Sequence, residues 1–399
     1  MIELLAPAGN LEKAKIAVLY GADAVYVGGQ RFSLRSRASN FSLEEIAQLA
    51  EFAHAHGSHV HVTVNILPHE GDLDGLKEYL LALDEVGIDA IIAASPAILK
   101  LAKDLNVGYE CHVSTQHSST NSLAVRFWKE QGMDRVVLGR ECTLEDIEQI
   151  AKEDLPVEVF IHGGMCISYS GRCVLSNHLT LRDANRGGCA QSCRWQYHVM
   201  DGEEELSDPA CLFSMSSKDL QAVDWIEPLM KAGVASLKIE GRMKSAYYLA
   251  TVISAYRHLI DAIEEKGYAS PEDLAKARTE IAKAENRPTG PGFYKGLPGP
   301  DVQLFARHDE NVTQEFVALV LEAGEGRMKF QTKNKFLAGD ALEIFGPHLE
   351  SQPIALFDIQ DEEGNPVEVL NQPMKVFTAR YEGAAEPQAM IRKIRTNDA

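Results

Sequence analysis

Short apolar runs alternate with amphipathic segments from the first residues of the chain to about residue 267. Eight of the runs are rich in β-branched and other apolar residues, a pattern typical of buried strands. These runs are Ile2–Ala6, Ala24–Val27, His59–Ile66, Ala90–Ala93, Tyr109–Val113, Arg135–Leu138, Val157–Ile161 and Ser236–Ile239. Apolar residues at helical spacing occupy the segments Leu11–Tyr20, Ser42–His56, Leu73–Val86, Pro96–Leu105, Ser122–Gln131, Thr143–Lys152, Asp219–Lys231 and Ser245–Lys266.

This alternation of strand-like and helix-like segments indicates the fold class. Eight β-then-α units in this length predict an α/β protein built on a (β/α)8 barrel of the TIM type. An open, doubly wound sheet is the alternative. No G-x-G-x-x-G fingerprint follows a predicted strand, so the dinucleotide-binding form of that sheet has no support.

The pattern changes after residue 267. A charged helical stretch and the Pro- and Gly-rich run NRPTGPGFYKGLPGP indicate a linker over residues 268–300. From 301 to 399, runs such as QEFVALVLEA and GRMKFQTKN alternate with turn residues and predict a small all-β barrel. We therefore expect a catalytic barrel over 1–267, a linker over 268–300 and a β domain over 301–399.

The connection after the seventh strand, residues 163–217, is far longer than a usual βα connection and carries four cysteines. Six residues separate Cys166 from Cys173, fifteen separate Cys173 from Cys189, and three separate Cys189 from Cys193. Functional groups of (β/α)8 barrels lie at the carboxyl ends of the strands. This segment, called the cysteine loop below, should therefore lie over the mouth of the barrel.

Composition favours a metal-binding or redox role for these thiols. No apolar run reaches membrane-spanning length and the start lacks the regions of a secretory signal, so we expect a cytoplasmic protein with no membrane partner. Disulfides are disfavoured in that compartment, and the total of seven cysteines is odd. Four thiolates suit an iron–sulfur cluster or a tetrahedral zinc ion. Only the last pair approaches zinc-knuckle spacing, which favours iron–sulfur; unrelated buried or free cysteines are the remaining interpretation.

Polar side chains at the ends of the predicted strands are candidates for the rest of the site. His162 and Glu240 are candidates for proton transfer, and Arg140 with Glu141 follow the sixth strand. Lys238, inside the eighth strand, would be costly to bury unless it is paired or catalytic. Arginine forks bind carboxylate or phosphate, and the substrate-binding candidates are Arg31, Arg35, Arg37, Asn65 and Arg242. Packed or solvated roles are the alternative for each of these residues.

Other features narrow the possible functions. His54, His56, His59 and His61 straddle a helix end and a strand start, and we expect them not to converge on one metal. The net charge of −19 argues against a general polyanion binder but allows a local basic patch. The chain has no H-E-x-x-H, G-x-S-x-G or P-loop motif, so hydrolysis by these motifs is unsupported.

Several stretches together resemble one known family. EVFIHGGMCISYSGRCVLSNH is similar to the signature of the collagenase-like peptidases, a peptidase family of unknown catalytic type. The resemblance extends to LLAPAGNLEKAKIAVLYGADAVYVG, RFSLRSRASNF, SLKIEGRMKS and KNKFLAGDALEI, so it covers nearly the whole chain. It is closest to the tRNA uridine hydroxylase branch and less close to the ribosomal RNA cytidine hydroxylase branch. The stretch between CRWQY and SSKDL is shorter here than is usual in the family.

The resemblance implies a prephenate-dependent enzyme that places a hydroxyl on carbon 5 of the wobble uridine in tRNA. It further implies an iron–sulfur cluster, expected to be 4Fe-4S, on Cys166, Cys173, Cys189 and Cys193, with prephenate as co-substrate and the tRNA anticodon region as partner. Cations suited to the prephenate carboxylates are Arg31, Arg35, Lys238 and Arg242. In the β domain, the candidates to grip tRNA are Lys333, Asn334, Lys335, Arg392, Lys393 and Arg395.

Functions of other classes remain open. A peptidase whose cysteines bind zinc predicts a colourless protein that cleaves peptides, and the peptidase could also carry a cluster. A non-catalytic scaffold would use the cluster for structure alone. Within RNA modification, ribosomal RNA cytidine hydroxylation is the alternative.

Overall fold

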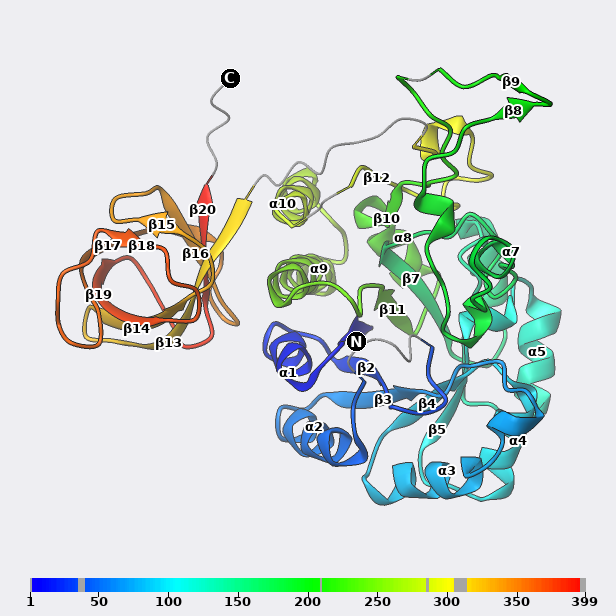
Figure 1. The fold of residues 1–399 in the computed structure, drawn as a ribbon. Coiled ribbons are helices and arrows are strands. Elements are labelled where there is room, and N and C mark those ends of the chain that lie inside the picture. The colour runs from blue at the N-terminus through cyan, green and yellow to red at the C-terminus, as the bar shows by residue number, and fades with distance from the viewer. Residues whose placement is uncertain (1, 35–39, 209, 285–286, 305–313, 395–399) are drawn as a thin grey trace.

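The computed structural model describes residues 2–34, 40–208, 210–284, 287–304 and 314–394 (Figure 1). Its larger part is a closed parallel barrel, which confirms the predicted (β/α)8 fold. The strands are β1 (Glu3–Pro7), β2 (Ala24–Gly28), β3 (His59–Thr63), β4 (Ala90–Ala93), β5 (Glu110–Val113), β6 (Arg135–Val137), β7 (Val157–Gly163) and β11 (Ser236–Ile239). Each strand pairs with the next, and β11 closes the barrel by pairing with both β1 and β7.

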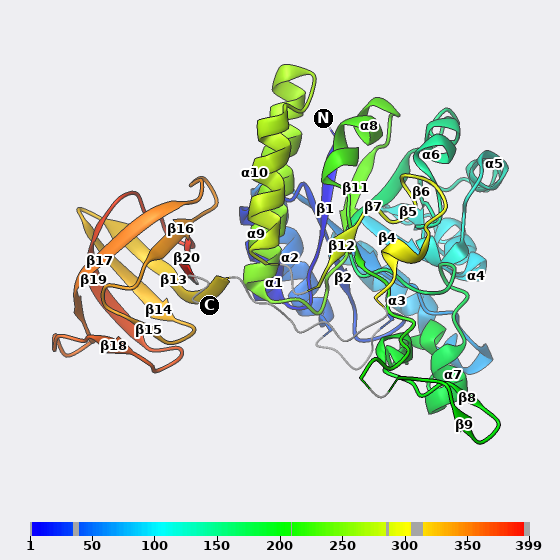
Figure 2. The same ribbon diagram turned by 90° about the horizontal axis from the view of Figure 1, so that it is seen from above.

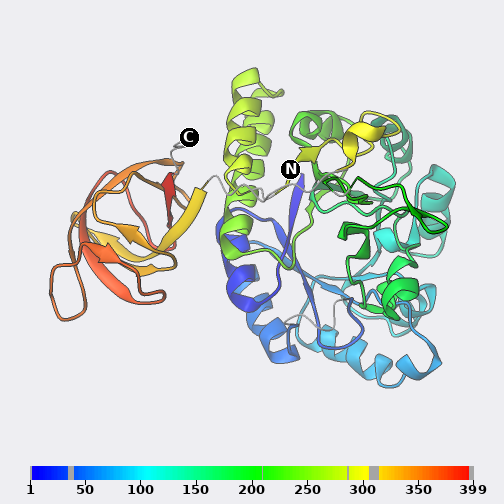
Figure 3. The ribbon, with the colours of Figure 1, turned by 45° about the horizontal axis from the view of Figure 1, so that its top comes forward.

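Helices surround the barrel strands (Figure 3). They are α1 (Leu11–Leu19), α2 (Leu43–Ala55), α3 (Leu76–Glu85), α4 (Pro96–Asp104), α5 (Ser122–Glu130), α6 (Leu144–Ile150), α8 (Ile226–Lys231) and α9 (Ala246–Lys266). Their starts are fixed by the sequence: Ser42 with Glu45, and Thr143 with Asp146, form capping boxes that satisfy amide groups of the first turns of α2 and α6.

The expected helix Asp219–Lys231 is wrong over its first half. Residues Asp219–Gln221 form strand β10, which runs antiparallel to the end of β7, with Leu220 opposite Gly163 and Gln221 opposite His162. A 3-10 turn at Val223–Trp225 then leads into the short helix α8. Pairing with the end of β7 outweighs the weak helical preference of this segment.

The cysteine loop bends back from β7 across the carboxyl ends of the other strands. It contains helix α7 (Leu175–Thr180), 3-10 turns at Ala184–Arg186 and Ser192–Arg194, and the hairpin of β8 (Met200–Asp201) and β9 (Glu204–Glu205). The Ser170 amide donates to Glu141 Oε1 after β6 (2.7 Å), and the Leu67 amide after β3 donates to the Asn185 carbonyl (3.2 Å). These contacts place the loop over the mouth of the barrel.

Residues after α9 complete the barrel domain before the second domain begins. Helix α10 (Pro271–Ala282) lies beside α9, and β12 (Thr289–Gly290) adds to β10. The C-terminal domain is a closed barrel of β13 (Gln314–Gly324), β14 (Arg327–Thr332), β19 (Val376–Glu382), β17 (Gln352–Gln360), β16 (Leu342–Phe345) and β20 (Met390–Ile394). Strands β15 (Phe336–Leu337) and β18 (Val369–Leu370) pair separately. The predicted all-β domain is thus confirmed.

The two domains meet through α1, α9 and α10. Phe316 stacks on Tyr247 of α9 with ring centroids 5.5 Å apart. The Arg392 side chain is completely buried, where its guanidinium donates to Glu343 Oε2 (2.6 Å) and Glu280 Oε2 (2.7 Å). The prediction that Arg392 grips RNA is therefore wrong, because both of these carboxylates already hold it inside the molecule. Arg395 lies outside the described residues.

Candidate functional site

The four cysteines of the loop come together at one place. Burial raises the pKa of the Cys193 thiol; Arg194 opposes this shift, and the charges of the Cys166, Cys189 and Cys173 thiolates add to it. Although Cys166 is exposed, the protein around its thiol reduces hydration and raises its pKa, while Arg140 and Arg194 act in the opposite direction. Such mutual influence requires the four thiols to be near neighbours.

Two kinds of metal group use four thiolates, and each has its own spacing of the sulfur ligands. Four sulfurs bound to one zinc ion lie about 3.8 Å from one another, because each Zn–S bond is about 2.3 Å in a tetrahedron. Among the described residues, three ligand atoms within 4.8 Å of one another occur only at His54, His59 and Asp89. No three of the loop cysteines are that close. A cluster with several irons has a wider arrangement of its ligands, and the four-thiol donor set fits such a cluster.

Arg194 fixes the cysteine loop at both of its ends. Its guanidinium donates to the Met165 carbonyl near the start of the loop (2.8 Å). It also donates to Ser216 Oγ (2.8 Å) and the Ser217 carbonyl (2.5 Å) at the end, and pairs with Asp219 at 3.5 Å. Because Arg194 directly follows Cys193, the bonds that close the loop also hold a cysteine in place.

A pocket opens beside Cys166 at the mouth of the barrel. Its walls come from the cysteine loop, the end of β6, the start of β10 and the segment after β12, and they include Cys166, Ile167, Tyr169, Arg140, Glu141, Lys218, Asp219, Phe293, Pro298 and Val302. Arg140 and Lys218 are its cations, and Phe293, Pro298 and Val302 make it partly apolar. The Arg140 guanidinium also lies 3.9 Å from the centroid of the Phe160 ring. Cations and apolar walls together suit an organic anion or a base.

The proton-transfer candidates have different surroundings. Glu240 lies near Cys166, because its backbone abuts Gly163 and its charge raises the pKa of the Cys166 thiol. His162 is buried between the rings of Tyr248 and Tyr256, and its Nδ1 is 3.3 Å from the Tyr256 hydroxyl. Burial lowers the pKa of His162 to about 3, so the ring is neutral at physiological pH. It is not part of the pocket lining.

Lys238 points into the barrel interior, where it is almost fully buried. Its Nζ lies 2.7 Å from Glu158 Oε1 and 4.4 Å from the centroid of the Tyr26 ring. Burial works to raise the pKa of Glu158, but Lys238 and Arg135 outweigh burial and hold that pKa below its usual value. Lys238 is thus a paired interior charge, and it is not among the residues that line the pocket.

The remaining substrate-binding candidates support loops at the mouth. Arg242 is buried and donates to Ser33 Oγ (3.2 Å), the Leu34 carbonyl (3.3 Å) and Asn40 Oδ1 (3.0 Å). Asn65 accepts from the Leu34 amide (3.0 Å) and donates to Gln116 Oε1 (2.7 Å). Both residues hold the connection after β2.

Arg31 is exposed and donates to the carbonyl of Asp74 (2.5 Å), so it ties the connection after β2 to the start of α3. Arg35 and Arg37 lie outside the described residues. Sequence reasoning missed Lys218 and Phe293 as pocket residues. Lys218 directly precedes the strand that had been expected as a helix, and Phe293 lies in the segment expected as a linker. No sequence pattern therefore indicated that either residue lies in the pocket.

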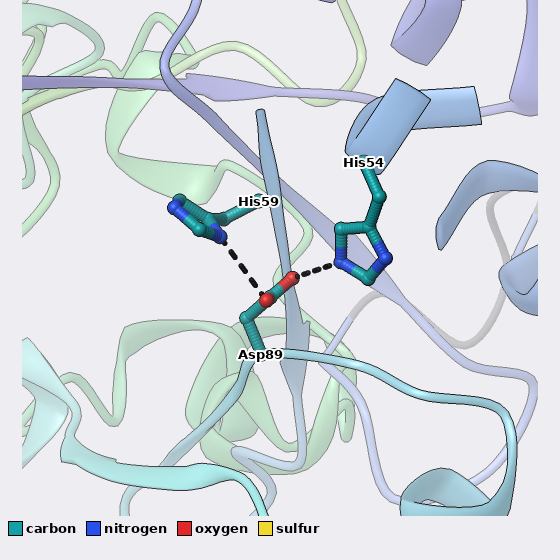
Figure 4. Close-up of side chains that lie close together, drawn as sticks. All are labelled: His54, His59 and Asp89. Atoms are coloured by element: carbon teal, nitrogen blue, oxygen red, sulfur yellow. Dashed lines mark hydrogen bonds and ion pairs between the residues drawn. The ribbon is translucent and has the colours of Figure 1, made fainter. Parts of the chain in front are cut away.

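A second cluster lies at the opposite end of the barrel (Figure 4). His54 Nε2 is 2.9 Å from Asp89 Oδ2, and His59 Nδ1 is 3.1 Å from Asp89 Oδ1. The expectation that the histidine run does not converge holds for His56 and His61, but His54 and His59 do meet on one carboxylate. The cluster ties the end of α2 to the starts of β3 and β4, away from the pocket.

Comparison with known proteins identifies the family. A model of peptidase family U32 matches residues 9–303, and a model of the U32 C-terminal domain matches residues 312–392. The chain therefore belongs to peptidase family U32. No helix among the described residues is both long and apolar enough to cross a bilayer.

Relatives within this family carry different names. A protein of Bacillus subtilis called tRNA hydroxylation protein P1 is 46% identical over 402 residues, covering 98% of this chain and 94% of the relative. The 23S rRNA 5-hydroxycytidine C2501 synthase of Escherichia coli is 40% identical, covering 70% of this chain and 42% of the relative. A Porphyromonas gingivalis protein named collagenase is 34% identical, covering 74% and 73%.

Proposed function

We propose that this protein is an RNA-modifying enzyme that hydroxylates carbon 5 of the wobble uridine in tRNA. The observation that carries the proposal is the pocket at the mouth of the barrel, because Cys166 belongs both to its wall and to the four-cysteine site. Two of the relatives are named for RNA hydroxylation, and the relative with that name for tRNA spans almost the whole chain.

In this proposal Cys166, Cys173, Cys189 and Cys193 hold an iron–sulfur cluster of the 4Fe-4S type. The four-thiol donor set and the nearby guanidinium groups of Arg140 and Arg194 support it, since positive charge favours bound thiolates. When bound, the cluster supplies a centre that exchanges single electrons, which side chains alone do not provide. The residues around it bind and orient the substrates.

Prephenate, a dicarboxylate, is the proposed co-substrate. Arg140 and Lys218 are the cations of the pocket, and each can pair with one carboxylate. They replace Lys238 and Arg242 in this role, because those two residues are buried among protein partners. Glu240 remains the candidate for proton transfer, since it lies beside Cys166.

The test combines colour with nucleoside analysis. Anaerobically purified protein should be brown, and tRNA from a deletion strain should lack 5-hydroxyuridine until the wild-type gene is returned. Returning the Cys166→Ala variant should not restore the nucleoside. A colourless, zinc-loaded protein that cleaves peptides would instead support the peptidase alternative. Loss of 5-hydroxycytidine from ribosomal RNA with unchanged tRNA would support the ribosomal alternative.

A further inference from the structure

The cysteine loop exposes an unusual share of apolar surface. Ten of the 23 exposed large apolar side chains among the described residues lie between Ile167 and Phe213. Three of the ten are aromatic: Tyr169, Trp195 and Phe213, which are 63%, 43% and 42% exposed. Exposed aromatic rings concentrated on one loop are typical of a binding surface rather than of chance exposure.

The first part of the cysteine loop, residues 164–198, has a charge opposite to that of the whole chain, whereas residues 199–213 add five acids and no basic residue. Residues 164–198 contain four arginines and one acid, Asp183, whereas the full sequence has 58 acidic and 39 basic residues. Arg186 and Arg194 are engaged with Asp72 and Asp219. Arg172 is exposed and Arg182 is half-buried. A basic surface with interleaved aromatic rings matches single-stranded nucleic acid, whose bases stack and whose phosphates need cations.

The aromatic residues are connected to the proposed reaction site. Tyr169 lines the same pocket as Cys166. Trp195 lies two residues after Cys193, at the end of the 3-10 turn Ser192–Arg194. Phe213 is joined to Tyr197 by two backbone hydrogen bonds of 2.8 and 3.1 Å. Tyr169 and Trp195 therefore lie beside cysteines of the loop, and Phe213 is held to the same loop by backbone bonds.

We infer that the cysteine loop is itself the RNA-binding surface, with Tyr169 and Trp195 stacking unpaired nucleotides and Arg172 contacting a phosphate. The inference rests on the proposed function and names the part of the protein that receives its RNA. It differs from the expectation that the β domain grips tRNA, because the loop and that domain lie on different sides of the barrel (Figures 1 and 2). A target base that leaves its stack would enter the pocket past Tyr169.

The experiment measures binding of a fluorescein-labelled anticodon stem-loop RNA to the cluster-loaded full chain by fluorescence anisotropy. Trp195→Ala and Tyr169→Ala should each raise Kd about fivefold or more, because base stacking on one ring has that value. Arg172→Ala should lower the slope of log K against log salt concentration by about 0.7, as expected for one lost contact to a single strand. Trp195→Phe should restore most of the lost affinity.

The matched control is Tyr268→Ala. Tyr268 is 54% exposed, next to the end of α9 and outside the loop, and its removal should leave Kd unchanged. Visible absorbance of each variant shows whether the cluster site is intact. If Trp195→Ala loses the cluster absorbance, the RNA affinities of Tyr169→Ala and Arg172→Ala test the inference instead. Wild-type affinity in those variants, together with normal tRNA hydroxylation, would overturn the inference and leave the proposed function standing. Weakened RNA binding in a protein that never hydroxylates tRNA would support the inference and refute the proposed function.

Discussion

Charged side chains occur at two levels of the same barrel, and the two sets serve different purposes. In the interior, Glu158 and Lys238 are 0% and 4% exposed, and Glu158 also accepts from Arg135. At the mouth, Arg140 and Lys218 line an open pocket. Each buried charge needs an opposite charge within the protein, since burying an unpaired charge costs free energy. Charges at the mouth can instead pair with a ligand. The depth of a charged residue in the barrel, more than its type, therefore indicates whether it stabilises the fold or is available for binding.

The largest effect should come from the cysteines. Cys193→Ala should abolish cluster binding and reduce 5-hydroxyuridine formation by about a hundredfold or more, because loss of a residue that only supports a metal ligand already costs about 10–100-fold at metal sites. Visible absorbance and nucleoside analysis measure the two effects. Cys211→Ala is the matched control, because it removes a thiol of the same loop that is not one of the four proposed ligands. Equal absorbance in both variants would remove Cys193 from the ligand set.

The interior pair should matter for stability. Lys238→Met leaves Glu158 buried without its nearest cation and should lower the free energy of unfolding by about 3–5 kcal/mol. Lys218→Met, the matched change at the mouth, should alter it by about 0.5 kcal/mol or less. Denaturant titration of both variants makes the comparison. Similar losses in the two would show that the interior and the mouth do not differ as described.

The pocket cations should matter for substrate binding. Arg140→Ala and Lys218→Ala should each raise KM for prephenate about tenfold or more, the usual cost of a lost charge-assisted hydrogen bond. The melting temperature should change little. Steady-state hydroxylation at varied prephenate gives the values, with exposed Lys129→Ala as the control. Unchanged KM in both pocket variants would exclude this pocket as the carboxylate site.

The smallest effect at neutral pH concerns His162. Its folded-state pKa of about 3 lies below the usual value of 6.5, so the unfolded chain binds one more proton between these two values. The contribution of neutral His162 to the free energy of unfolding is therefore fully present above pH 6.5. It is lost as the pH falls, by up to about 1.4 kcal/mol per pH unit. His162→Gln should remove this contribution. Unfolding free energies at pH 7, 6 and 5 test it, and parallel curves for both proteins would contradict it.

Much of the barrel could be predicted because its strands are buried on both faces and therefore read as continuous apolar runs. The four cysteines were also visible, as a cluster after a strand. The side chains around them were harder to assign. A residue at a strand end lies near the mouth, but sequence does not show that Arg242 turns into protein partners or that His162 lies between two tyrosines.

Long-range pairing explains the other misses. β10 forms because its residues meet the end of β7, a contact between segments almost sixty residues apart. Lys218 and Phe293 reach the pocket through the same kind of contact. The local sequence of neither segment indicates which distant residues it contacts. The capping boxes of α2 and α6 involve residues three positions apart, so they could be predicted from the sequence.

The segment after β12 has a practical meaning for anyone who dissects this protein. Phe293, Pro298 and Val302 form part of the pocket wall, and the Tyr294 hydroxyl bonds to the Phe160 carbonyl of β7. A fragment ending at residue 267, where composition suggests a boundary, would keep every cysteine and every barrel strand. It would nevertheless lack one side of the pocket beside Cys166. The smallest fragment with a complete pocket wall must extend at least to residue 303.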